Sequence, residues 1–456
     1  MSISLINPAT GETIRSYEYM REAEVEKRII RANEVYASWR KTSMSHRAER
    51  MMKAAAILRE GKEKYARLMG LEMGKPIREA RGEVEKCAWV CEYYAGNAAA
   101  FLADETVVTD ASLSFISYQP IGVVLAVMPW NFPFWQVFRF AAPALMAGNA
   151  GLLKHASNVP GCAEAIEEIF LEAGFPKGLF ANLKIPGSRV AAVIRHPVVK
   201  AVTLTGSGPA GSAVASAAGG AIKKTVLELG GSDAYLILRD ANLGLAAKTC
   251  AQSRLLNAGQ SCIGAKRFIV VPEVYDAFLE KFLANMAAAK MGSPYDETTD
   301  LGPMARHDLR EELHSQVLRS IEKGAVCLLG GAIPEGNPGA YYPATVLAEV
   351  APGMPAWEEE LFGPVAAVIR AQDEAGAICI ANSSVFGLGA AVFTEDVERG
   401  QRIAAIELEA GACFVNGMVK SDPRLPFGGI KQSGFGRELS VQGIREFVNA
   451  KTVWVR

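Results

Sequence analysis

The two residues best suited to catalysis by their type and local sequence are a cysteine and a glutamate. Cys262 ends a run from Asn257 whose small and polar residues suit a turn better than a core. Glu228 stands where an apolar run, 225–229, meets the pair Gly230-Gly231. A thiolate is a strong nucleophile, and a neighbouring carboxylate takes a proton from a thiol or from water. The pair predicts covalent catalysis, although a lone cysteine is more often buried and inert.

Asn131 lies between two aromatic residues, Trp130 and Phe132, and just before Pro133. Its side-chain amide could donate to an oxyanion formed when Cys262 adds to a carbonyl, with the Cys262 backbone N–H as second donor. The alternative is that Asn131 caps the helix that Pro133 begins. The two roles are compatible.

A glycine-rich segment, residues 205–211, follows a predicted strand and opens a predicted helix. Backbone amides at such a helix start bind a pyrophosphate, and small residues allow its close approach. The spacing of Gly206 and Gly211 differs from the usual Gly-x-Gly-x-x-Gly, and no lysine follows to make a P-loop. By itself the segment is equally consistent with an ordinary strand–helix turn.

Composition excludes several functional classes. The 456 residues exceed one small core, so two or more lobes are expected. The net charge of −1 offers no basic field for nucleic acid or an anionic membrane. The chain starts without a signal peptide, and no apolar run is long enough to span a bilayer. Eight cysteines without a secretory signal indicate free thiols in the cytoplasm, and their spacing predicts no metal site.

The order of predicted elements indicates an α/β fold. Residues 24–100 are predicted to be mostly helical, and residues 112–119 alternate as a strand exposed on one face does. From residue 122 strands and helices alternate, which favours a doubly wound parallel sheet. The strands of this first series are predicted at 123–127, 151–154, 179–183, 201–204 and 225–229. A second series follows at 235–238, 268–271, 365–369, 390–393 and 413–415, and a last strand at 452–455 has no evident partner in its own lobe.

Together these motifs resemble the aldehyde dehydrogenase superfamily over nearly the whole chain, from residues 7–12 to 451–453. The resemblance implies an aldehyde dehydrogenase-like α/β fold with two doubly wound lobes and a β oligomerisation arm. The implied division is residues 1–110 and 121–230 for a Rossmann-type dinucleotide-binding domain, 231–432 for the catalytic domain, and 111–120 with 446–456 for the arm. In the family this arm pairs between subunits, so a homodimer or homotetramer is expected.

The resemblance also implies a reaction. Cys262 attacks the aldehyde, Asn131 holds the oxyanion, hydride passes to NAD or NADP, and Glu228 activates the water that hydrolyses the thioester. It assigns the cofactor to Trp130, Lys154, Ser157, Gly206, Ser207, Gly211, Glu360 and Phe362. Trp130 is also a candidate wall of the substrate tunnel, and Glu438 a proton relay. Without the resemblance, Lys154 and Glu360 would be ordinary surface charges.

Three departures from the family pattern bear on chemistry. Phe140 stands where many members have a lysine of the proton-relay region, so the relay here differs or runs through water. Ser157 stands where NAD-preferring members have a glutamate that repels a 2′-phosphate, so both cofactors are expected. Gly264 replaces the second cysteine of some relatives, which removes a redox pair with Cys262.

Within the superfamily the chain most resembles the succinate-semialdehyde dehydrogenases. Arg139 and Ser421 match residues that hold the substrate carboxylate there, and a guanidinium binds both oxygens of a carboxylate. A second arginine of those enzymes is missing, because the position holds Leu256. Arg254, Lys420 and Arg424 are candidates to replace it. The alternative for Arg139 is a surface arginine bonded to a neighbouring helix.

Three other functions compete with this interpretation. A general short-chain aldehyde dehydrogenase would lack carboxylate selectivity. A cofactor-free cysteine acyltransferase or hydrolase would leave residues 206–211, Lys154 and Glu360 unexplained. A non-catalytic relative is disfavoured because Cys262, Glu228 and Asn131 are all present.

Overall fold

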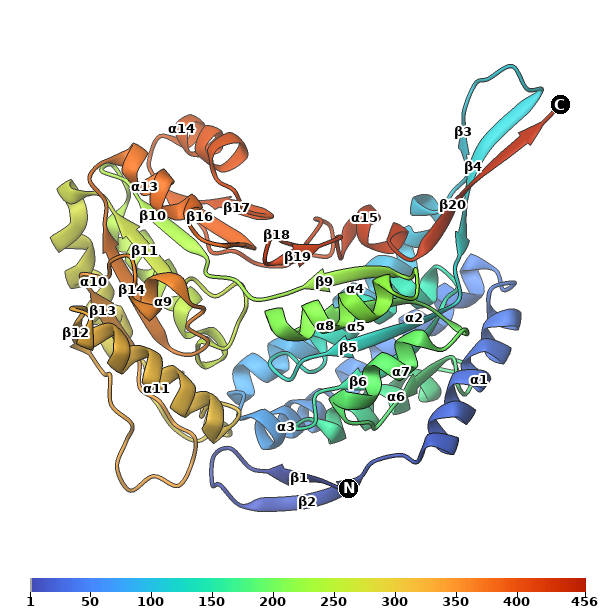
Figure 1. The fold of residues 1–456 in the computed structure, drawn as a ribbon, viewed down its shortest axis with the longest axis horizontal. Helices are drawn as coiled ribbons and strands as arrows, with labels where there is room; N and C mark the ends of the chain where they lie inside the picture. Colours follow the sequence, from blue (N-terminus) through green and yellow to red (C-terminus); the bar gives the residue numbers. More distant parts are fainter. Residues whose placement is uncertain (1) are drawn as a thin grey trace.

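The computed structural model describes residues 2–456, which form two α/β lobes and a projecting arm (Figure 1). The first lobe is built on a six-stranded sheet in the order β19-β9-β8-β5-β6-β7. Its strands are parallel except for β19, which returns late in the chain and pairs antiparallel with β9. The strands are β5 (Val123–Met128), β6 (Ala150–His155), β7 (Phe180–Asn182), β8 (Val199–Thr205), β9 (Lys224–Glu228) and β19 (Gly434–Phe435).

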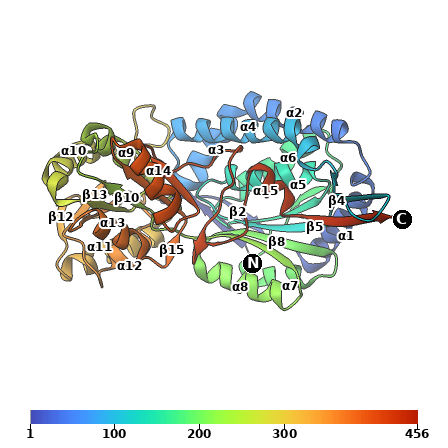
Figure 2. The same ribbon diagram turned by 90° about the horizontal axis from the view of Figure 1, so that it is seen from above.

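Helices cover both faces of this sheet. Figure 2 shows α2 and α4 on one side of β5 and β8, with α7 and α8 on the other. Buried apolar residues of these layers form one continuous core. The helices of the lobe are α1 (Glu22–Trp39), α2 (Met44–Glu60), α3 (Lys62–Met73), α4 (Ile77–Phe101), α5 (Trp135–Met146), α6 (Pro160–Glu172), α7 (Val190–Arg195) and α8 (Gly208–Gly219).

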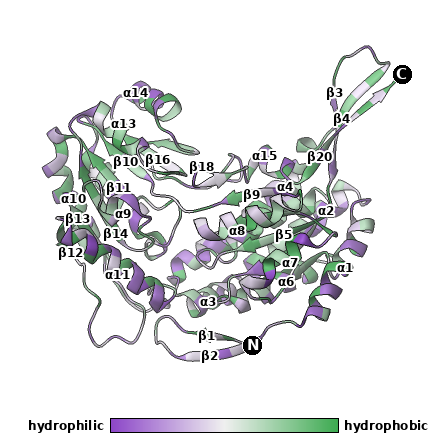
Figure 3. Ribbon diagram, viewed as in Figure 1, coloured by the Kyte–Doolittle hydropathy of each residue, from purple (hydrophilic) through white to green (hydrophobic). Residues whose placement is uncertain are grey.

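The second lobe has a seven-stranded sheet in the order β12-β13-β14-β11-β10-β16-β17. Only β12 is antiparallel to its neighbour. Hydrophobic residues follow its central strands (Figure 3), as expected of strands buried on both faces. The strands are β10 (Ala234–Ile237), β11 (Arg267–Val270), β12 (Val326–Leu329), β13 (Thr345–Ala348), β14 (Val365–Arg370), β16 (Gly389–Phe393) and β17 (Ala412–Val415). The covering helices include α9 (Leu243–Leu255), α10 (Tyr275–Ala287), α11 (His307–Glu322), α13 (Glu374–Asn382) and α14 (Val397–Arg402).

The arm consists of three antiparallel strands, β3 (Glu105–Thr106), β4 (Leu113–Pro120) and β20 (Val448–Val455). The last strand, for which the sequence shows no partner in its own lobe, pairs along its whole length with β4 of the same chain. The arm extends away from the first lobe and carries the C-terminus (Figure 1).

The predicted α/β class and the two doubly wound lobes are confirmed. The N-terminal hairpin was not predicted. The hairpin of β1 (Ser2–Ile6) and β2 (Thr13–Glu18) buries Ile3, Leu5 and Tyr17 in a small cluster of its own. No helix formed by residues 2–456 has both the length and the apolar character that a bilayer crossing requires.

The chain crosses between the lobes in two places that meet. It leaves the first lobe after β9 through Gly230-Gly231, and it returns through residues 427–438. On the return, Gly434 pairs with Glu228 and Phe427 pairs with Glu438. The returning segment therefore brings Glu438 to the end of the lobe where Glu228 lies.

Candidate active site

The loop that carries Cys262 has an uncommon backbone conformation. Asn257, Ala258 and Gly259 have φ values of 56°, 52° and 73°, in the left-handed region. This conformation is costly for residues with a Cβ, so surrounding contacts must hold it. The Asn257 amide donates to Glu79 Oε2 at 2.8 Å, and its side-chain Nδ2 donates to the Asn131 carbonyl at 2.7 Å. The Cys262 loop is thus fixed to α4 and to the Asn131 loop.

Asn131 is buried, and its Nδ2 donates to the Gln260 carbonyl at 3.1 Å. It does not cap α5, so the capping alternative is wrong. Instead Glu83 of α4 accepts from the backbone amides of Phe134 and Trp135, both at 2.9 Å, where α5 begins. A carboxylate at a helix N-terminus stabilises it by its charge and by these hydrogen bonds. The side chain of Asn131 is left beside the cysteine loop, and its oxyanion role stays a prediction.

Cys262 borders two cavities, which is the central geometric fact of this site. The smaller cavity has a volume of about 280 Å³ and a largely apolar wall. The larger has a volume of about 560 Å³ and reaches the segment 205–209. The smaller cavity is lined by Glu79, Gly82, Glu83, Lys86, Phe132, Trp135, Gln136, Arg139, Leu256, Ser261, Cys262, Ile263, Met418, Val419, Lys420, Ser421 and Phe427.

The Cys262 thiol is half-buried and free. Burial raises its pKa to about 12, against the opposing effect of the positive charges of Arg139 and Lys266. The thiol is consequently protonated near neutral pH, and reaction requires a base that removes its proton.

Glu228 is a candidate for such a base. It is 2% exposed, and neither carboxylate oxygen has a hydrogen-bond partner among residues 2–456. Burial raises the pKa of Glu228 well above its ordinary value, and the negative charge of Glu438 raises it further, while Arg139 lowers it. An unpaired carboxylate with a raised pKa is suited to take up a proton.

Arg139 lies between the two glutamates. It is 2% exposed, so the surface alternative for this arginine is wrong. Its Nε forms an ion pair with Glu438, and its Nη2 donates to Thr205 Oγ1 at 3.3 Å. The guanidinium also lies over the Phe427 ring, 4.7 Å from its centroid. Phe140, by contrast, packs in the core against Phe447, so the family's lysine position has no polar role here.

Ser421 borders the smaller cavity, as does a lysine that the sequence did not single out. Lys86 of α4 donates from Nζ to Ser421 Oγ at 2.8 Å, across 335 positions of the chain. Of the candidates to replace the missing arginine, only Lys420 borders this cavity. Arg254 is buried and donates to the Gly259 carbonyl, and Arg424 is paired with Asp422 at the surface.

The larger cavity has the features that a dinucleotide needs. Ser207 precedes α8, but its side chain does not cap the helix. It therefore leaves the first backbone amides of α8 without this partner, at a helix start that borders the cavity. Gly211 lies one turn on, where a Cβ would come within 2.6 Å of the Leu229 side chain, so the glycine allows α8 to pack closely against this leucine. A dinucleotide therefore fits this wall.

Two aromatic rings and a carboxylate line the other end of the larger cavity. Trp130 and Phe362 meet edge to face with centroids 5.8 Å apart. Trp130 does not border the smaller cavity, whose aromatic wall is Phe132, Trp135 and Phe427. Glu360 accepts from the Gly231 amide at 3.0 Å and from Lys266 Nζ at 3.2 Å, so it is no ordinary surface charge.

Lys154 and Ser157 lie at and just beyond the end of β6, outside the lining of the larger cavity. Burial lowers the pKa of Lys154, which is half-buried. Ser157 is exposed and borders a small pocket with Lys184, whose Nζ donates to Glu164 at 2.7 Å. The cofactor contacts assigned to Lys154 and Ser157 stay predictions.

A model of the aldehyde dehydrogenase family matches residues 1–453. The chain belongs to this family. It is 53% identical over 455 residues to a probable succinate-semialdehyde dehydrogenase [NADP(+)] of Synechocystis sp., with all of both chains covered. It is 49% identical over 458 residues to succinate-semialdehyde dehydrogenase [NADP(+)] 1 of Mycobacterium tuberculosis, again with full coverage. The structure of succinic semialdehyde dehydrogenase from Streptococcus pyogenes in complex with NADP+ matches with a TM-score of 0.97, at 39% identity and 99% coverage of each chain.

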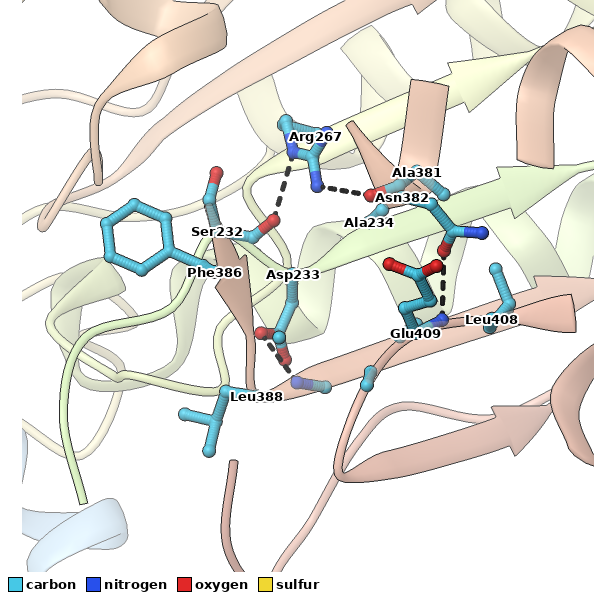
Figure 4. A pocket seen from close by; sticks show the side chains of 14 residues that line it. Ser232, Asp233, Ala234, Arg267, Ala381, Asn382, Phe386, Leu388, Leu408 and Glu409 are labelled. Atoms are coloured by element: carbon cyan, nitrogen blue, oxygen red, sulfur yellow. Dashed lines mark hydrogen bonds between the residues drawn. The ribbon is translucent and has the colours of Figure 1, made fainter. Parts of the chain in front are cut away.

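This aldehyde dehydrogenase also has polar pockets that carry no evident chemistry. Figure 4 shows one of about 10 Å³ in the second lobe. There Arg267 donates to the Ser232 and Ala381 carbonyls, and the Gly389 amide donates to Asp233. These hydrogen bonds join β11 to α13, and β11 and β16 to the segment before β10, and the pocket has no room for a ligand. No cluster of three or more potential metal ligands occurs within residues 2–456.

Proposed function

We propose that this aldehyde dehydrogenase oxidises succinate semialdehyde to succinate, with NADP or NAD as the hydride acceptor. The observation that carries the proposal is the smaller cavity, because the Cys262 thiol, the Arg139 guanidinium and the Ser421 hydroxyl all belong to residues that line it. A short aldehyde with a carboxylate at its far end matches such a cavity. The names of the curated relatives, which share about half of the sequence, support the same substrate and NADP.

The first chemical step belongs to Cys262. Its sulfur adds to the aldehyde carbon after a base removes the thiol proton. The Asn131 amide and the Cys262 backbone N–H donate to the resulting oxyanion, whose charge they stabilise. Glu360 and Phe362, which line the larger cavity, would hold the nicotinamide end of the cofactor, and this group would accept the hydride.

The second step releases the acid from Cys262. After oxidation the acyl group is held on this sulfur as a thioester, and Glu228 takes a proton from the attacking water. The unpaired oxygens and raised pKa of Glu228 support this role, because the carboxylate of a weaker acid is a stronger base. Glu438 lies beyond Arg139 and is the candidate to exchange the proton with solvent.

The far-end carboxylate is assigned to Arg139 and Ser421, which both border the smaller cavity. A guanidinium forms strong charged hydrogen bonds to a carboxylate. The Nε of Arg139 is paired with Glu438, however, so only the Nη side of the guanidinium is left for the substrate carboxylate.

Cofactor choice is assigned to Ser157, which has no charge to repel a 2′-phosphate and can donate a hydrogen bond to it. The enzyme is therefore expected to accept both NADP and NAD. The projecting arm, with exposed Leu113, Trp454 and Val455, is the expected contact between subunits of a homodimer or homotetramer. All eight cysteines are free, which fits a cytoplasmic enzyme.

The test compares kcat/KM for succinate semialdehyde with kcat/KM for butyraldehyde, which has the same length without the charge. A carboxylate-binding site should favour the acid by at least about tenfold, since a charged hydrogen bond contributes roughly 1.5–3 kcal/mol. Equal use of both substrates would leave a general short-chain aldehyde dehydrogenase and would refute the assignment of the substrate.

A further inference from the structure

We propose that Lys86, together with Ser421, binds the far-end carboxylate of the substrate and replaces the cation that is missing at Leu256. The inference rests on the proposed function and extends it, because neither the motifs nor the relatives' names assign a role to this lysine.

Lys86 belongs to a row of residues that α4 presents to the smaller cavity. Glu79, Gly82, Glu83 and Lys86 follow the spacing i, i+3, i+4, i+7 and all border the cavity. The two acidic members are already occupied. Glu79 accepts from the Asn257 amide, and Glu83 pairs with Lys75 and accepts from the start of α5. One face of α4 therefore positions the Cys262 loop and the Asn131 loop, and Lys86 is the last residue of this face at the cavity.

Lys86 differs from the two arginines near the cavity because its charge is not neutralised. Within residues 2–456 no carboxylate forms an ion pair with it, whereas Arg139 and Arg424 each have one. Lys420 also borders the cavity without an ion pair in this part of the chain, but its side chain is exposed, whereas Lys86 is half-buried. The Nζ of Lys86 has one hydrogen bond, to Ser421 Oγ, and lies 4.2 Å from the centroid of the Trp135 ring. An ammonium has three donors, so two remain for a carboxylate beside the serine.

The electrostatic setting of Lys86 also suits an incoming anion. Burial and the positive charge of Arg139 lower its pKa to about 8, while Glu83, Cys87 and Asp422 act in the opposite direction. A carboxylate that binds between Lys86 and Ser421 would stabilise the charged form. The affinity for the acid substrate should consequently weaken as pH rises above about 8, where free Lys86 loses its proton.

The competing explanation is that the Lys86–Ser421 hydrogen bond only joins α4 to the C-terminal loop. A purely structural bond would affect all aldehydes alike. A carboxylate-binding lysine affects only substrates with the charge, and mainly their KM.

The experiment uses the full-length enzyme and compares Lys86→Met with Lys86→Arg and with Lys62→Met. The methionine keeps the length of the side chain without its charge, and the arginine restores a charge. Lys62 is the matched control, because it pairs with Glu85 of α4 outside the cavity. Each variant is assayed with succinate semialdehyde and with butyraldehyde.

Lys86→Met should lower kcat/KM for succinate semialdehyde at least about tenfold, mostly through KM, and change butyraldehyde oxidation less than about twofold. Lys86→Arg should retain most of the preference for the acid, and Lys62→Met all of it. Unimpaired butyraldehyde turnover shows that a variant is folded. Equal losses with both substrates, or an unchanged preference in Lys86→Met, overturn the role of Lys86 and leave the proposed function intact. A wild-type enzyme without preference for the acid overturns the proposed function itself.

Discussion

Glu438→Gln should move the pH dependence of deacylation toward lower pH. In the native protein the charges of Arg139 and Glu438 largely offset each other next to Glu228. Glutamine preserves the size of the side chain but removes its charge, so Arg139 loses its anionic partner. The full positive charge of Arg139 then acts on Glu228 and lowers the pKa of this carboxyl.

The size of the shift follows from the lost repulsion between the two carboxylates. If roughly 8 Å is taken as the separation of two unit charges, they interact by about 2 kcal/mol at an effective dielectric constant of about 20. This energy corresponds to about 1.5 pKa units. Deacylation requires ionised Glu228, so its rate rises with pH through the pKa of this group. In the variant the rise should occur about 1.5 units lower, with a modestly lower plateau because the base is weaker.

The assay separates deacylation from hydride transfer. The enzyme is acylated on Cys262 with p-nitrophenyl acetate, and the rate of turnover after the burst of nitrophenolate is followed from about pH 5 to 10, the range in which such groups titrate. The burst amplitude counts the functional sites, which controls for partial unfolding. This control is needed because loss of one partner of a buried ion pair typically costs about 3–5 kcal/mol of stability.

Two outcomes would refute the reasoning about Glu438. A profile that keeps its midpoint would show that the charge of Glu438 does not tune Glu228, and would leave Glu438 only its proposed role in proton transfer. A shift toward higher pH would show that Arg139 no longer faces Glu228 once its partner is neutral.

Three further changes test the remaining assignments. Cys262→Ala should abolish dehydrogenase activity yet leave binding of NADP, measured by fluorescence titration, nearly intact; a variant with a tenth of wild-type turnover would contradict a nucleophilic cysteine. Glu228→Gln should slow steady-state turnover more than the pre-steady-state burst of reduced cofactor, because hydrolysis of the thioester needs this base; an equal loss in both phases would show that Glu228 is needed equally for removal of the thiol proton of Cys262. Ser157→Glu should raise the KM for NADP far more than the KM for NAD, because a carboxylate repels the 2′-phosphate; unchanged NADP affinity would show that Ser157 does not face the ribose.

Local patterns were enough to place most of the secondary structure. The strands predicted at 123–127 and 365–369 are observed at Val123–Met128 and Val365–Arg370, because strands buried on both faces form continuous apolar runs. The N-terminal hairpin was missed. The first strand alternates over only five residues, and the second buries Tyr17 alone, so the pattern is too short to mark a hairpin.

The sequence by itself determined the family, the α/β architecture and the candidate catalytic residues Cys262, Glu228 and Asn131. Each of these three residues stands in a motif that a short stretch of chain defines. Only the tertiary structure decided how these groups are arranged. The pairing of Arg139 with Glu438, the helix start capped by Glu83 and the contact of Lys86 with Ser421 join residues that are far apart in the chain. Such contacts depend on how the returning segment and α4 pack around one cavity, and a lysine or glutamate that faces a cavity has the same local sequence pattern as one that faces solvent.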